Sequence, residues 1–112
     1  MGKLINSNQE EFQGIIESET GIVLVDFWAE WCGPCRMLTP VLQSLSEEVD
    51  VTIIKVNVDE NPELSAKYGV RNIPIVFVIK NGEELERIVG LKDKNTYIST
   101  VEKYTTSNES ED

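Results

Sequence analysis

Two stretches of the chain are almost continuously hydrophobic and rich in β-branched residues. Residues 22–27 read Ile-Val-Leu-Val-Asp-Phe, and residues 51–58 read Val-Thr-Ile-Ile-Lys-Val-Asn-Val. Such runs are typical of strands that are buried on both faces of a sheet. Between them, hydrophobic residues recur at helical spacing, at Leu38, Val41, Leu42 and Leu45. The order strand, helix, strand predicts a parallel crossover.

The second half of the chain predicts a hairpin between two helices. Residues 75–79 and 84–89 have strand-like patterns on either side of Asn81-Gly82, a dipeptide that favours a type I′ turn. A helix is expected from Asn61-Pro62 to about Gly69. Three further segments carry short hydrophobic patterns: a strand at Leu4 and Ile5, a helix with Phe12, Ile15 and Ile16 on its buried face, and a last helix with Tyr97, Ile98, Val101 and Tyr104.

The length of the chain favours one domain. It has 112 residues, of which 40% are hydrophobic, and this is enough for a single core without a stabilising crosslink. We expect the domain to cover residues 1–104. Residues 105–112 have no hydrophobic side chain and carry three acidic groups, so they predict a disordered C-terminal tail.

The charge balance and the N-terminal sequence bear on partners and location. Twenty acidic residues against ten basic residues give a formal charge of -10, which disfavours nucleic acid and anionic membranes as partners. Residues 1–21 lack the run of about 7–15 apolar residues of a signal peptide, and no stretch approaches the roughly 18 apolar residues of a membrane span. We therefore expect a cytoplasmic protein.

The candidate chemistry lies in one short motif, Trp31-Cys32-Gly33-Pro34-Cys35. It contains the two cysteines of the chain, which has no histidine. A structural zinc site needs four ligands, c-type haem needs a histidine after the second cysteine, and an iron-sulfur cluster needs more cysteines. We expect no metal and no cofactor. Redox chemistry is the favoured interpretation, and a purely structural pair is the alternative.

The spacing of the two thiols suits reversible disulfide formation. Residues three apart on a helix lie about 5–6 Å apart, within the range that a disulfide tolerates. Cys32 falls at the start of the predicted helix, where unpaired N–H groups and the helix dipole stabilise a thiolate. Cys35 falls one turn inside and is expected to be shielded. Gly33 and Pro34 fix the turn between the thiols.

A longer segment, from Val25 to Cys35, resembles the active-site segment of the thioredoxin family. The likeness extends over about residues 4–104 and includes Asp59-Glu60-Asn61-Pro62, Tyr68-Gly69-Val70-Arg71, Ile73-Pro74, Lys80-Asn81-Gly82 and Gly90. The resemblance implies an α/β thioredoxin fold, with a five-stranded mixed β-sheet flanked by four α-helices. It also implies reduction of protein disulfides and recycling by a thioredoxin reductase.

By the same resemblance, Cys32 is the attacking thiolate, Cys35 the resolving thiol, and Asp26 the buried carboxyl that exchanges a proton with Cys35. Asp26 interrupts a hydrophobic strand, and burial would raise its pKa. The alternative is a carboxylate at a strand end that points to water. Lys55 interrupts the neighbouring strand and matches a lysine that lies near the carboxyl in thioredoxins. Its charge would oppose the effect of burial, and either effect could be the larger.

The resemblance also implies a substrate-docking surface. Pro74 matches the cis-proline of the family, beside which the backbone at Ile73 could pair with an extended substrate. The expected docking residues are Trp31, Gly33, Pro34, Ile73, Pro74, Val89, Gly90 and Leu91. For Trp28 we expect a packing role. Asn72 and Ile75 depart from the usual residues around the Ile-Pro pair, and they bear on partner preference rather than on thiol chemistry.

The favoured hypothesis is a thiol-disulfide oxidoreductase that acts as a monomer on disulfide-containing proteins. A second hypothesis is a protein-binding subunit or chaperone that uses the hydrophobic surface around Trp31 without turning over its thiols. A third is an oxidase or isomerase of a secretory compartment, which would need an export signal that the N-terminus does not encode.

Overall fold

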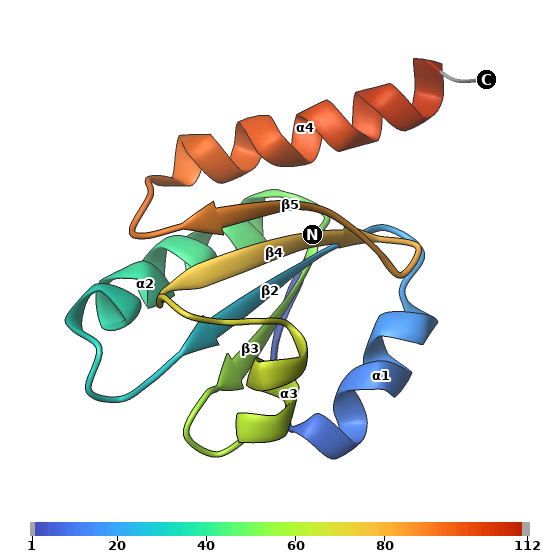
Figure 1. The fold of residues 1–112 in the computed structure, drawn as a ribbon. Helices are drawn as coiled ribbons and strands as arrows, with labels where there is room; N and C mark the ends of the chain where they lie inside the picture. Colours follow the sequence, from blue (N-terminus) through green and yellow to red (C-terminus); the bar gives the residue numbers. More distant parts are fainter. Residues whose placement is uncertain (1, 111–112) are drawn as a thin grey trace.

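The computed structural model describes residues 2–110, and the side chains of residues 2–105. Within this part the chain forms one sheet and four helices (Figure 1). The strands are β1 (Lys3–Asn6), β2 (Ile22–Trp28), β3 (Thr52–Asn57), β4 (Ile75–Lys80) and β5 (Glu83–Val89). The helices are α1 (Gln9–Ser18), α2 (Gly33–Glu48), α3 (Pro62–Lys67) and α4 (Lys94–Ser110). The elements predicted from the hydrophobic pattern are all present.

The strands form a mixed sheet in the order β1-β3-β2-β4-β5. β3 is parallel to β1 and β2, which confirms the predicted crossover through α2. β4 is antiparallel to β2 and β5. The turn between β4 and β5 has positive φ at both Asn81 (53°) and Gly82 (79°), as a type I′ turn requires. The expected five-stranded mixed sheet with four helices is confirmed.

Both faces of the sheet are covered, which explains the continuous hydrophobic runs. Leu24 of β2 packs with residues of α2 and α4, whereas Val23 and Val25 pack with residues of α1 and α3. Figure 1 shows α4 on one side of the sheet and α1 and α3 on the other. Because successive side chains of a strand point to opposite faces, Asp26 continues the row of Leu24 and faces α2 and α4.

Helix α4 is longer than the sequence predicts. It spans Lys94–Ser110, so the backbone of residues 105–110 is helical where a disordered tail was expected. The helix therefore passes Tyr104, the expected end of the domain, without a break. The division of the chain into a domain and a tail stays a prediction, and residues 111–112 lie outside the described part.

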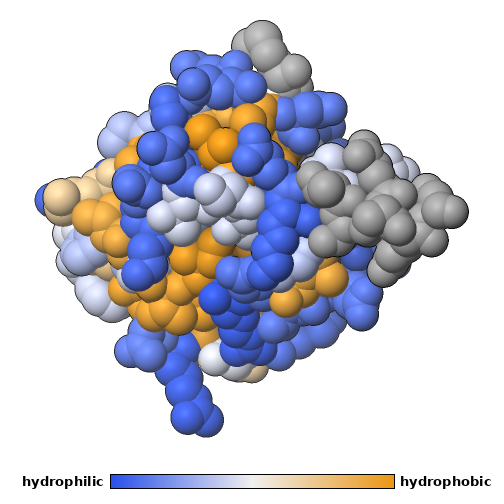
Figure 2. Space-filling model, turned by 90° about the horizontal axis from the view of Figure 1, so that it is seen from above, coloured by the Kyte–Doolittle hydropathy of each residue, from blue (hydrophilic) through white to orange (hydrophobic). Residues whose placement is uncertain are grey.

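The surface on the side of α4 is mainly hydrophilic. Figure 2 shows this face with hydrophobic patches between polar and charged side chains.

Among residues 2–110, no helix is long and apolar enough to cross a membrane.

Candidate active site

The two cysteines lie where the chain passes from β2 into α2. Cys32 is the N-cap residue of α2, and its Sγ accepts a hydrogen bond from the backbone N–H of Cys35 at 3.2 Å. Gly33 and Pro34 form the first turn, where the missing N–H of proline costs no helical hydrogen bond. The cysteines are joined by a disulfide with a Cα–Cα distance of 5.2 Å. The predicted position of Cys32 at the helix N-terminus is confirmed.

Both sulfur-bearing side chains are nearly covered. Cys35 is 1% exposed, as expected for the inner residue, but Cys32 is only 5% exposed. They pack with Ala29 and against the half-buried side chains of Trp28, Val58 and Ile73. The predicted packing role of Trp28 is therefore confirmed. Only a small part of the Cys32 side chain is therefore open to the surface.

Asp26 and Lys55 form an ion pair in the core beside this site. They are direct Cα partners on β2 and β3, and Lys55 Nζ donates to Asp26 Oδ2 at 3.0 Å. Asp26 is 0% exposed, so it does not point to water, and Lys55 is 6% exposed. Burial raises the pKa of Asp26 above its ordinary value, although the positive charge of Lys55 opposes this shift. Of the two opposing effects on the pKa of Asp26, burial is therefore larger than the charge of Lys55.

A third side chain connects this ion pair to α2. Lys55 Nζ also donates to Thr39 Oγ1 at 3.1 Å, and Thr39 Oγ1 donates to the backbone carbonyl of Cys35 at 3.3 Å. The Lys55 ammonium lies 4.9 Å from the centre of the Trp28 ring. Sequence reasoning missed Thr39. The one sequence feature that could have indicated Thr39 is its place four positions after Cys35, where a polar residue lies on the face of α2 that also carries buried hydrophobic residues.

The Ile73-Pro74 segment borders the cysteines. Its peptide bond is cis, as the family resemblance predicted. Cys32 Sγ lies 3.9 Å from the carbonyl oxygen of Ile73. The backbone N–H of Gly90 donates to the carbonyl of Pro74 at 2.9 Å, and Gly90 has a φ of 90°, which favours glycine there.

Large hydrophobic side chains are exposed near this segment and along the start of α2. Trp31 is 68% exposed, Val89 50% and Leu91 40%, and their docking role stays a prediction. Met37 is 61% exposed, and sequence reasoning missed it because it continues the hydrophobic pattern of α2. The indole N–H of Trp31 donates to Asp59 Oδ2 at 2.9 Å, a contact across 28 positions of sequence that no local pattern indicates.

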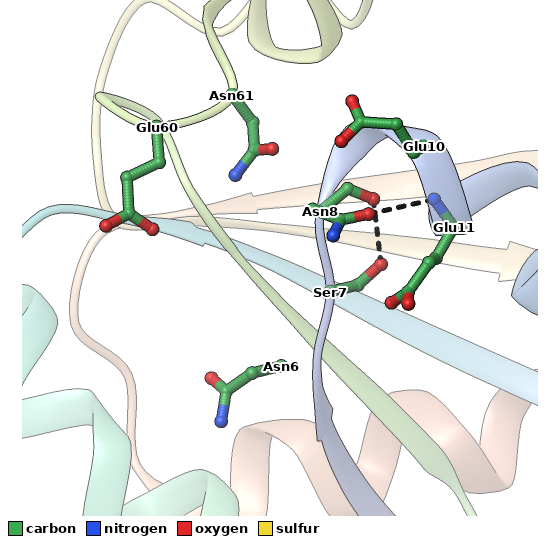
Figure 3. A pocket seen from close by; sticks show the side chains of 7 residues that line it. All are labelled: Asn6, Ser7, Asn8, Glu10, Glu11, Glu60 and Asn61. Carbon is green, nitrogen blue, oxygen red and sulfur yellow. Dashed lines mark hydrogen bonds between the residues drawn. The ribbon is translucent and has the colours of Figure 1, made fainter.

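A polar pocket near the start of α1 is separate from the thiol site. It has a volume of about 330 Å³, and Figure 3 shows the side chains that line it: Asn6, Ser7, Asn8, Glu10, Glu11, Glu60 and Asn61. Asn8 Oδ1 caps α1 by accepting from the backbone N–H of Glu11 at 2.9 Å, and Asn61 Oδ1 accepts from the backbone N–H of Gln9 at 2.9 Å. The Asn61 amide thus attaches the start of α1 to the start of α3.

No group of three or more His, Cys, Asp or Glu side chains among the described residues could hold a metal ion. What the site offers instead is a cysteine pair that closes into a disulfide at a helix N-terminus, with a buried carboxyl on the sheet below that helix. These features define the class of thiol-disulfide oxidoreductases.

Comparison with known proteins agrees with this class. The family model described as Thioredoxin matches residues 3–103. A thioredoxin of Chlamydia pneumoniae is 50% identical over 105 residues, covering 93% of this chain and 99% of the relative. A thioredoxin of Chlamydia caviae is 50% identical over 96 residues, covering 85% and 92%. A solved mutant thioredoxin from Halobacterium salinarum superposes with a TM-score of 0.86 at 38% identity, covering 92% of this chain and 91% of its own.

The chain belongs to the thioredoxin family. It is a thiol-disulfide oxidoreductase that reduces protein disulfides with its own cysteine pair. Its partners are disulfide-containing proteins and a reductase that restores its dithiol. The alternative of a binding subunit without turnover is not favoured by these relatives.

Proposed function

We propose that Cys32 attacks the substrate disulfide and that Cys35 resolves the mixed disulfide. The observation that carries this assignment is the hydrogen bond from the Cys35 N–H to Cys32 Sγ, because a backbone donor at a helix N-terminus stabilises a thiolate on Cys32. In the first step the Cys32 thiolate forms a bond to one substrate sulfur. The substrate S–S bond breaks, and the other substrate sulfur leaves as a thiolate that takes up a proton.

In the second step Cys35 attacks Cys32 Sγ. The Cys35 thiol first gives its proton to the Asp26 carboxylate, and the bond between Cys32 and the substrate then breaks as the Cys32–Cys35 disulfide forms. Asp26 Oδ1 is buried and has no hydrogen-bond partner among the described residues, which leaves a lone pair free to accept that proton. A raised pKa suits Asp26 to this role near neutral pH. The second substrate sulfur leaves as a thiolate and takes up a proton from solvent, and Asp26 later returns its own proton to solvent. The substrate has then gained two electrons and two protons.

The oxidised protein then needs an external source of two electrons. We assign this to a thioredoxin reductase, which returns the Cys32–Cys35 disulfide to the dithiol. The disulfide in the structure corresponds to the oxidised half of this cycle. The sulfur that the reductase reaches is Cys32, since Cys35 is the more deeply buried.

An extended segment of the substrate is the proposed ligand of the surface around Cys32. The carbonyl of Ile73 lies 3.9 Å from Cys32 Sγ, so a substrate backbone that pairs there brings its own disulfide to the sulfur. The exposed side chains of Trp31, Val89 and Leu91 would cover its hydrophobic groups. The same proposed surface includes the backbone of four further residues, Gly33, Pro34, Pro74 and Gly90. Of these, Gly33 and Pro34 also fix the distance between the thiols.

The proposal includes a cytoplasmic monomer that does not bind nucleic acid. The formal charge of -10 supports the last point, because phosphates would be repelled. In a reducing compartment such as the cytoplasm, disulfides that open and close during turnover are more common than permanent crosslinks. The proposed location therefore agrees with the proposed redox cycle.

The test is reduction of a protein disulfide, followed through NADPH oxidation in the presence of a thioredoxin reductase. The wild-type chain should give turnover, and Cys32→Ser should reduce it to the background rate. A wild-type rate no higher than that of the Cys32→Ser control would contradict the proposal.

A further inference from the structure

The hydroxyl of the half-buried Thr39 has an orientation fixed by two hydrogen bonds. Its single proton goes to the carbonyl of Cys35 at 3.3 Å, one turn earlier in α2. A hydroxyl has one proton and two lone pairs, so Thr39 can only accept the hydrogen bond that it shares with Lys55 Nζ at 3.1 Å. The Lys55 ammonium is thus held between two acceptors, the other being Asp26 Oδ2 at 3.0 Å.

The Lys55 side chain also borders a pocket that contains other groups able to bind its ammonium. Lys55 lines a pocket of about 280 Å³ together with Trp28 and two carboxylates, Glu30 and Glu60. A lysine side chain is long and flexible, and its ammonium is strongly hydrated, so water and these carboxylates would stabilise an outward position. Within the described contacts, Thr39 is the acceptor on α2 that opposes this movement.

We propose that Thr39 is a positioning residue that holds the Lys55 ammonium against Asp26, and thereby keeps a positive charge beside the carboxyl while Cys35 gives up its proton. The inference deepens the proposed function, since it rests on Asp26 as the proton acceptor. Loss of the Thr39 hydroxyl should let Lys55 move toward the pocket. Asp26 would then lose the charge that favours its ionised form, and its titration would move to higher pH.

Several groups face Asp26 from the elements around it. β3 contributes Lys55 and α4 contributes the fully buried Tyr97, whereas Val76, the partner of Asp26 on β4, is apolar. Burial raises the pKa of Tyr97, with a smaller effect of the negative charge of Asp26, so its phenol stays neutral across the range of interest. In the oxidised protein Cys35 does not titrate. The ion pair with Lys55 is therefore the interaction that Thr39 can change.

The test is a carboxyl-carbon NMR titration of Asp26 in the oxidised protein, assigned with Asp26→Asn. Thr39→Val keeps the shape of the side chain and removes the hydroxyl, and the titration midpoint should rise by about half a pH unit or more. Thr39→Ser restores the hydroxyl and should return the midpoint to within about 0.2 units of the wild type. In a Lys55→Met background, Thr39→Val should have no further effect, because its partner is gone.

An unchanged midpoint in Thr39→Val, or a shift to lower pH, would overturn the proposal, as would an equal shift in the Lys55→Met background. Failure of Thr39→Ser to restore the midpoint would do the same, since it would show that packing rather than the hydroxyl matters. This titration needs no turnover. It therefore separates a wrong role for Thr39 from a wrong role for Cys32, which the reduction assay tests independently.

Discussion

Lys55 Nζ donates to Asp26 Oδ2 at 3.0 Å, between strand positions that are direct partners in the core of the sheet. Both side chains are almost fully buried, so each charge has lost most of its hydration. The ion pair leaves one carboxyl oxygen unpaired, because Asp26 Oδ1 has no hydrogen-bond partner in the part of the chain that the structure describes. A buried carboxyl in this condition is poised to accept a proton, and its environment leads to the following predictions.

Asp26→Asn should become more stable relative to the wild type as pH rises. Burial raises the pKa of Asp26, so below its ordinary pKa of about 3.9 both folded and unfolded chains keep the proton. Above that value the unfolded chain ionises first, and the wild type loses about 1.4 kcal/mol per pH unit until the folded carboxyl also ionises. Urea unfolding of the oxidised proteins at a series of pH values measures this difference.

Asp93→Asn is a suitable control for that experiment. Asp93 is exposed, and hydrogen bonds from Thr96 lower its pKa. Its contribution to stability is present above the ordinary pKa and is lost as pH falls, so the stability difference should change with pH in the opposite direction. Parallel curves for the two variants would contradict the assignment of the pH dependence to Asp26.

Lys55→Met should move the pH dependence of protein-disulfide reduction to higher pH. The substitution removes the charge that opposes the effect of burial, so the pKa of Asp26 rises further. With less carboxylate available as a base, the rate at neutral pH should fall by roughly tenfold. Lys3→Met removes a surface ion pair with Glu19 and should leave the profile unchanged. Superimposable profiles for Lys55→Met and the wild type would exclude this coupling.

Cys35→Ser should accumulate a mixed disulfide between Cys32 and the substrate. The backbone N–H of residue 35 still stabilises the Cys32 thiolate, but no second thiol is present to release it. Turnover should drop by about a hundredfold or more, and the adduct should be visible by mass spectrometry under non-reducing conditions. Cys32→Ser should form no adduct. Adducts in similar amount on both variants would contradict the proposed division of roles.

Asp59→Ala should weaken docking of protein substrates. In the wild type, the Asp59 carboxylate accepts from the Trp31 indole N–H and so holds this exposed side chain at the edge of the site. The substitution removes that acceptor. Because an exposed hydrogen bond contributes about 1 kcal/mol, KM for a protein disulfide should rise roughly three- to tenfold. The rate with a small disulfide that does not reach Trp31 is the control and should change little. Equal losses with both substrates would indicate a defect in the thiols instead.

Much of the fold follows from local sequence patterns. The hydrophobic runs at 22–27 and 51–58 predicted central strands because both faces of such strands are covered. Asn81-Gly82 predicted its turn because few residues other than asparagine and glycine adopt positive φ at low cost. At the C-terminus, composition predicts a disordered tail from residue 105, whereas the backbone of α4 is helical to Ser110, and the division into domain and tail stays a prediction.

The sequence by itself determined the strands, the hairpin and the position of Cys32 at the start of a helix, because these depend on neighbours within a few residues. Tertiary structure alone decided that burial outweighs Lys55 at Asp26, that Thr39 contacts Lys55, and that Asp59 holds Trp31. The physical reason is that the pKa of a buried group depends on the side chains packed around it. In this protein those side chains come from strands and helices that are distant in sequence.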